Sequence, residues 1–263
     1  MRRIALMLCV VLVVGSCIAA HAGSVSQPPK TGLSYDFASE INGGWAVVMA
    51  DDWVCPDGAP IYGIRWWGSY WTPPAPKAFT VYSDALNGAA AGGIDSFTIV
   101  VLPNVPAGGS MPFDHPDVNT SNALAGWQVG LAQANESPAF TVTKSTNPTV
   151  TEDVYSYYVD LTQVMGMPGG PFPQQQGTKY WLAIVANLDE PNKQWGWHEA
   201  DGHWGGYALQ AVLANTDVAW YVPCGGHDMA FELVIPEPGS LCALASGLTG
   251  LVGFVRRRRR LIS

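Results

Sequence analysis

Short runs rich in β-branched and aromatic residues recur along the chain between clusters of glycine and proline. In the run 154–161, for example, a mixed face at even positions alternates with an apolar face at odd positions, which is the period of a strand. No stretch of ten or more residues has the 3.6-residue period of an amphipathic helix. The first ordered element is expected near Trp45, and strands are expected at residues 45–49, 61–67, 78–82, 97–102, 127–132, 140–144, 154–161, 180–186, 207–213, 218–221 and 229–235.

About eleven short strands without crossover helices predict an all-β fold. The proline-rich turns favour an antiparallel two-sheet sandwich of jelly-roll type. With 48% hydrophobic and 13% charged residues among 263, the composition excludes disorder, a coiled coil and a polytopic membrane protein. The longest glycine- and proline-rich connections, residues 103–124 and 162–178, are expected to be surface loops over one end of the sandwich.

The first 22 residues have the organisation of a secretory signal peptide. Arg2 and Arg3 precede an apolar run, and Ala-His-Ala at 20–22 is a small-residue cleavage site. The exported ectodomain is therefore expected to span residues 23–235. A second reading stays open, because residues 14–17 resemble a bacterial lipobox that would make Cys17 a lipidated N-terminus.

The C-terminal residues 236–263 have three parts. Glu237, which has a proline on either side, is followed by an apolar stretch at 241–255 and then by five arginines. The stretch is predicted to form a single transmembrane helix of about 22 Å, and the positive-inside rule keeps the arginines cytoplasmic. This ending resembles a PEP-CTERM sorting signal, a resemblance that implies recognition and cleavage by an exosortase in the membrane. The motif residues are Pro236, Glu237, Pro238, Arg256, Arg257, Arg258, Arg259 and Arg260.

The ectodomain is strongly acidic once the two ends are set aside. Residues 23–235 keep six of the 13 basic residues and 20 of the 21 acidic ones, which gives a net charge of −14. Such a field repels nucleic acid and anionic lipid. The aspartates around Asp51, Asp52 and Asp57 lack the alternating ligand spacing of a calcium loop, so neither a metal nor a cofactor is expected.

Two cysteines remain in the ectodomain after processing, Cys55 and Cys224. In an oxidising exported compartment a lone pair is most simply a disulfide. The bond is predicted to join the beginning of the domain to its end.

The polar segment 195–204 contains His198, Glu199 and His203, which suggests zinc at first sight. A zincin helix needs its second histidine four residues after the first, whereas position 202 is glycine. The segment is therefore expected to be a polar loop with histidines packed against tryptophans. Serine-nucleophile elbows and phosphate loops are absent, so no catalytic residue is assigned. Carboxylate pairs such as Glu199 with Asp201 leave an extracellular hydrolase as the third interpretation.

Tryptophan is the most informative residue type, since all 11 lie in the ectodomain. Exposed indoles on a β-sandwich can stack on the apolar face of a sugar, so an extracellular polysaccharide is a candidate partner. The alternative is that the tryptophans fill the core. Alternation along a strand places Trp66 and Trp67 on opposite faces. The candidates for stacking are Trp66, Trp67, Trp71, Trp195, Trp197 and Trp204.

Six short segments also resemble an uncharacterised domain family of exported planctomycete-type proteins. The resemblance implies one β-rich domain and no assigned activity. The function expected from the sequence is that of an exported, surface- or matrix-associated, non-catalytic protein with a structural or adhesive role, and the alternative is a carbohydrate-binding module. The matching segments are residues 26–29, 50–55, 66–69, 177–182, 196–197 and 228–231.

Overall fold

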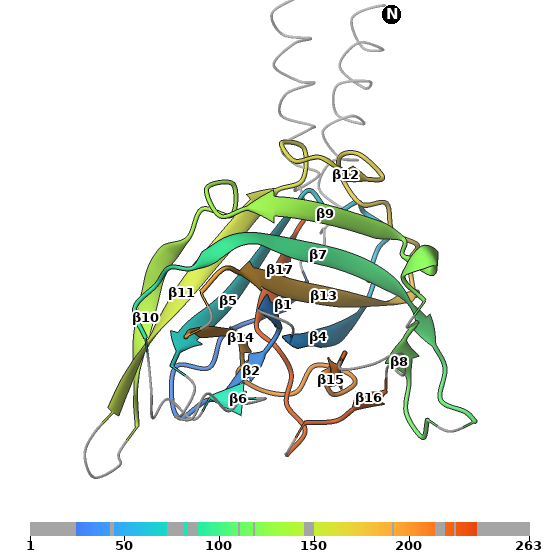
Figure 1. The fold of residues 1–263 in the computed structure, drawn as a ribbon. Helices are drawn as coiled ribbons and strands as arrows, with labels where there is room; N and C mark the ends of the chain where they lie inside the picture. The colour runs from blue at the N-terminus through green and yellow to red at the C-terminus, as the bar shows by residue number, and fades with distance from the viewer. Residues whose placement is uncertain are drawn as a thin grey trace, which may run out of the picture. The chain divides into compact units, whose positions relative to one another are not determined.

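Two β-sheets make up the part of the chain that the computed structural model describes (Figure 1). Ser24–Val234 form one compact unit. The described residues are 25–42, 45–72, 82–83, 89–109, 111–117, 119–144, 150–190, 192–213, 219–223 and 225–235.

The first sheet has eight described strands. Its central strand β5 pairs with β14, β17 and β11, and β10 continues the sheet beyond β11. Its strands are β1 (Val25–Gln27), β17 (Phe231–Val234), β5 (Gly63–Trp71), β14 (Gln194–His198), β2 (Asp36–Ala38), β6 (Tyr82–Ser83), β11 (Val150–Asp160) and β10 (Ser137–Lys144).

The second sheet has nine described strands and is built around β13, which lies between β7 and β4 (Figure 1). A short 3₁₀ helix, η1 (Thr120–Asn122), precedes β9. The strands are β12 (Gly166–Met167), β9 (Ala125–Gly130), β7 (Ile94–Val105), β13 (Lys179–Leu188), β3 (Glu40–Asn42), β4 (Trp45–Val54), β15 (Leu209–Val212), β16 (Trp220–Tyr221) and β8 (His115–Pro116), which pairs with β7.

Aromatic side chains from both sheets meet in the core between them. Trp66 of β5 stacks on Tyr157 of β11 with ring centroids 5.4 Å apart, and it meets the edge of Phe97 of β7 at 5.1 Å. The first two belong to one sheet and Phe97 to the other. The predicted all-β two-sheet sandwich is confirmed, and among the described ladders the pair β3–β13 departs from the antiparallel pattern because it is parallel.

β13 is buried on both faces. Leu182 and Ile184 belong to the core between the sheets, whereas Trp181 and Ala183 alternate with them and belong to a second apolar cluster. Phe113, from the predicted loop 103–124, packs against that second cluster. This connection therefore covers a sheet face and contains the end of β7, β8 and η1, so it is more ordered than the surface loop that was predicted.

The prediction that order begins near Trp45 is wrong, because β1, β2 and β3 precede that residue. These strands have three residues each and bury polar side chains, among them Gln27, Asp36 and Glu40. A buried polar side chain gives no apolar alternation, so the strand signal is missing from the sequence.

The two predicted targeting segments, residues 1–22 and 236–263, lie outside the described residues. Within the described ranges, no helix has the length and hydropathy needed to span a membrane. The stretch 241–255, which was predicted to do so, is not among them.

Candidate functional site

Four of the six tryptophans proposed for sugar stacking are core residues. Trp66, Trp195 and Trp197 are 0% exposed and Trp71 is 2% exposed, so their rings cannot contact a sugar. The stacking prediction is wrong for these four. Their neighbours are other strands of the same sandwich, which is the alternative that the sequence left open.

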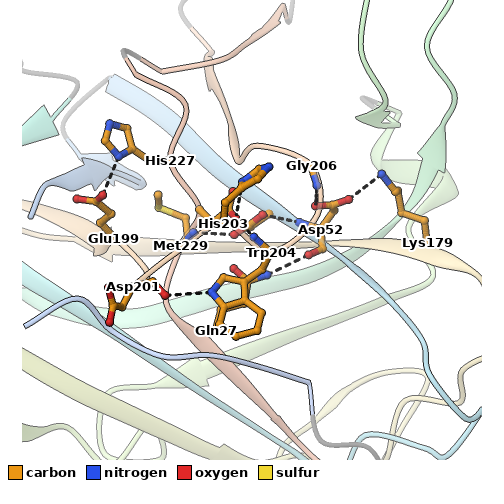
Figure 2. Close-up of polar contacts among 12 residues, drawn as sticks. Gln27, Asp52, Lys179, Glu199, Asp201, His203, Trp204, Gly206, His227 and Met229 are labelled. Atoms are coloured by element: carbon orange, nitrogen blue, oxygen red, sulfur yellow. Dashed lines mark hydrogen bonds and ion pairs between the residues drawn. The ribbon is translucent and has the colours of Figure 1, made fainter.

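Trp67 and Trp204 differ from these four. Trp67 is partly exposed while Trp66 is buried, which confirms that the two face opposite sides of β5. Trp204 is 47% exposed, and its Nε1 donates to the carbonyl of Asp201 at 3.3 Å. In Figure 2 its indole points away from the imidazole of His203.

The predicted disulfide is not formed in the structure. Cys55 is a free thiol that is 1% exposed and belongs to the core cluster between the sheets. Its Sγ accepts a hydrogen bond from the N–H of Gly58 at 3.2 Å. The side chain is thus packed and partnered within the core, and Cys224 lies outside the described residues.

The segment 195–204, predicted as a loop, begins as the strand β14, in which all five residues are buried. Gly68 of β5 makes this possible, since a Cβ there would lie 2.3 Å from Cζ2 of Trp195. Glycine at that position lets the indole lie directly on the backbone of the neighbouring strand. Trp195, Trp197 and His198 are therefore sheet residues, whereas His203 and Trp204 follow the strand and lie in the predicted loop.

After β14 the chain is held by the carboxylate of Asp52 on β4 (Figure 2). Its Oδ1 accepts the N–H of Gly206 at 3.0 Å, and its Oδ2 lies 2.8 Å from Nζ of Lys179 on β13. The same ammonium lies 3.1 Å from Oδ2 of Asp114, so one lysine joins two carboxylates. Burial opposes a charged ammonium, but the two carboxylates more than compensate and raise the pKa of Lys179.

Asp51 and Asp228 are two further buried carboxylates that hold backbone amides. Asp51 accepts the N–H of Asp52 at 2.7 Å and that of Met229 at 2.6 Å, while Oδ2 of Asp228 accepts the N–H of Trp204. Burial raises the pKa of Asp228. Burial, followed by the negative charge of Asp228, raises the pKa of Asp51 well above its ordinary value.

Glu199 joins the start of the domain to its end. Its Oε1 lies 2.8 Å from Nζ of Lys30 and 2.9 Å from Nδ1 of His227, and its Oε2 accepts the N–H of Tyr35 at 3.0 Å. Burial alone would raise the pKa of Glu199, but the hydrogen bonds from His227 and Lys30 lower it. The carboxylate is therefore ionised and fully engaged in this contact.

The imidazole of His198 is completely buried and lies between two hydrogen-bond acceptors. Its Nδ1 lies 2.8 Å from Oδ1 of Asp36 and its Nε2 lies 2.9 Å from the carbonyl oxygen of Lys30. Both partners are acceptors, and only the doubly protonated ring can donate to both of them at once. Burial lowers the pKa of His198, but the Asp36 carboxylate outweighs it and the pKa is raised.

The three histidines of this region do not converge. His198, His203 and His227 each contact a different carboxylate, namely Asp36, Asp228 and Glu199. Across the described ranges, no three histidine, cysteine, aspartate or glutamate side chains are grouped to hold a metal ion. The described geometry therefore shows carboxylates used as acceptors for backbone amides and for basic side chains.

A pocket of about 170 Å³ opens beside Lys179 on the outer face of the second sheet. Asp114 and Lys179 form its polar corner. The pocket was not predicted from the sequence, because its residues come from four separate segments that only the fold brings together. Its walls are apolar and aromatic, formed by Phe113, Trp181, Tyr207, Leu209 and Val222.

Comparison with known families gives two matches. Residues 24–245 match a family described as a domain of unknown function, DUF7901. The chain belongs to this family. Residues 234–260 match the PEP-CTERM protein-sorting motif, and together the two matches confirm both resemblances that the sequence suggested. No curated protein matches the chain.

The sorting motif identifies an exported protein that has a C-terminal membrane anchor before processing and is recognised by an exosortase, a membrane protease. The motif residues predicted from the sequence, Pro236 to Pro238 and Arg256 to Arg260, all fall within the matched range. The DUF7901 match assigns no reaction and no ligand.

Proposed function

We propose that this DUF7901 member is a non-catalytic protein of the cell surface or extracellular matrix with a structural or adhesive role. The observation that carries the proposal is the PEP-CTERM motif, because it directs an exported domain to the membrane for release at the outer side. Signal-peptide cleavage after Ala22 is part of this proposal.

The use of the buried acids supports a non-catalytic role. Asp51, Asp52, Asp228, Glu40 and Glu199 each accept at least one backbone N–H. A hydrolase with two carboxylates needs them free to face a substrate across a cleft. In this domain the same residue types tie loops and strands together, so the fold itself accounts for them.

Deletion of residues 236–263 is expected to release the protein into the medium. The deletion removes the apolar stretch and the arginines that would hold the chain in the membrane, and leaves the unit Ser24–Val234 intact. Immunoblots of cell and medium fractions measure the result. The full-length Trp204→Ala chain, which keeps the tail, should stay with the cells, and unchanged cell association of the deletion would refute sorting by the tail.

A further inference from the structure

The pocket beside Lys179 has room for one six-membered ring. Its volume is about 170 Å³, and an apolar protein cavity of roughly 150 Å³ accommodates one benzene molecule. Tyr207, which is 46% exposed, is an accessible wall of the pocket, while Trp181 and Leu209 are almost fully buried. A ring can therefore reach the pocket past Tyr207 and rest against fixed apolar side chains.

The polar corner of the pocket determines whether a bound ring must carry hydrogen-bonding groups. Lys179 is paired with Asp52 and Asp114, and the Lys179 and Asp114 side chains are 26% and 36% exposed. A purely hydrocarbon ring would take these charges out of water without returning a hydrogen bond, which is costly. A ring with an apolar face and hydroxyl groups at its edge can contact the aromatic walls and still bond to the charged corner.

The charge of the domain further limits the class of ligand that the pocket can bind. The ectodomain carries a net charge of −14, so anionic polymers are repelled over its whole surface. The imidazole of His203 lies against Tyr207 with ring centroids 4.5 Å apart and extends the aromatic surface beside the pocket. This surface can contact the next sugar unit of the same polysaccharide.

We infer that this pocket binds one pyranose unit of a neutral polysaccharide, with Tyr207 against the sugar face and Lys179 and Asp114 bonded to its hydroxyls. The inference rests on the proposed adhesive role, to which it adds a ligand class. It also moves sugar binding away from the core tryptophans to residues that the sequence did not single out.

The test is direct binding by the full chain, purified in detergent. The probes are the neutral oligosaccharides cellohexaose, xylohexaose and mannohexaose, with polygalacturonate as the acidic probe, measured by calorimetry. We expect saturable binding of at least one neutral probe and none of the acidic one. Absence of binding to every neutral probe would overturn the inference. Sorting is measured separately by cell fractionation, so the two proposals can fail independently.

Variants locate the site. Val222→Trp fills the pocket and Tyr207→Ala removes its exposed wall, so each should weaken binding about tenfold or more. Tyr62→Ala removes a 37% exposed tyrosine that does not line the pocket and should leave binding unchanged. Thermal unfolding shows that each variant is folded. Loss of binding in Trp204→Ala with full binding in Tyr207→Ala would overturn the inference.

Discussion

Replacing Trp195 with alanine is expected to lower the free energy of unfolding by about 3–5 kcal/mol, the usual cost of removing a buried tryptophan. The indole is completely buried, packs edge-on against Phe97 at 5.2 Å, and donates from Nε1 to the hydroxyl of Tyr157 at 3.2 Å. Gly68 lies directly beneath the indole and has no side chain that could fill the cavity. Urea denaturation followed by circular dichroism measures the change.

The matched control is Trp204→Ala. Trp204 is nearly half exposed and the hydrogen bond from its indole to Asp201 is long, so removal of the side chain should change stability by about 0.5 kcal/mol or less. Equal effects for the two substitutions would contradict the assignment of Trp195 to the core and of Trp204 to the surface.

Replacing Glu40 with glutamine is expected to change how stability depends on pH. Burial raises the pKa of Glu40 to about 7 from 4.5, although it accepts hydrogen bonds from the N–H of Trp195 and from the Gln194 amide. Between these two values the folded protein holds a proton that the unfolded chain has lost, so the contribution of Glu40 to stability falls as pH rises. The free energy of unfolding of the variant minus that of wild type should therefore rise by about 3 kcal/mol between pH 4.5 and pH 8.

The predicted quantity is the change with pH in the difference between the unfolding free energies of the two proteins. A hydrogen bond that the variant lacks at both pH values lowers its stability equally at both, so it does not affect this change. Glu190→Gln controls for the loss of one negative charge, since its carboxylate is 49% exposed beside Lys193. Parallel urea denaturation curves at the two pH values provide the data. A difference between variant and wild type that stays constant with pH would show that folding does not raise the pKa of Glu40.

The sequence predicted the strands best where apolar residues recur in quantity. Residues 97–102 and 180–186 were placed in strands and form the middle of β7 and β13. The short strands β2 and β14 were missed because they carry Asp36 and His198, whose polar side chains are buried in contact with each other. Local patterns cannot show that a distant residue will neutralise a charge.

The candidate site was predicted less well than the fold. The placement of Trp66 and Trp67 on opposite faces of a strand was correct. The stacking candidates, however, included four buried tryptophans, namely Trp66, Trp71, Trp195 and Trp197. Composition indicates how many indoles a chain has, and only tertiary packing decides which are covered. The pocket beside Lys179 depends on contacts between β4, β13 and β15, which no motif encodes.

The most direct measurement on the central proposal is the intact mass of the protein extracted from the cell surface. The proposal predicts a chain that lacks residues 1–22 and is cut within or next to the sorting signal, so that the arginines 256–260 are missing. A cell-surface protein with the mass of all 263 residues would contradict it, because neither end would then have been processed.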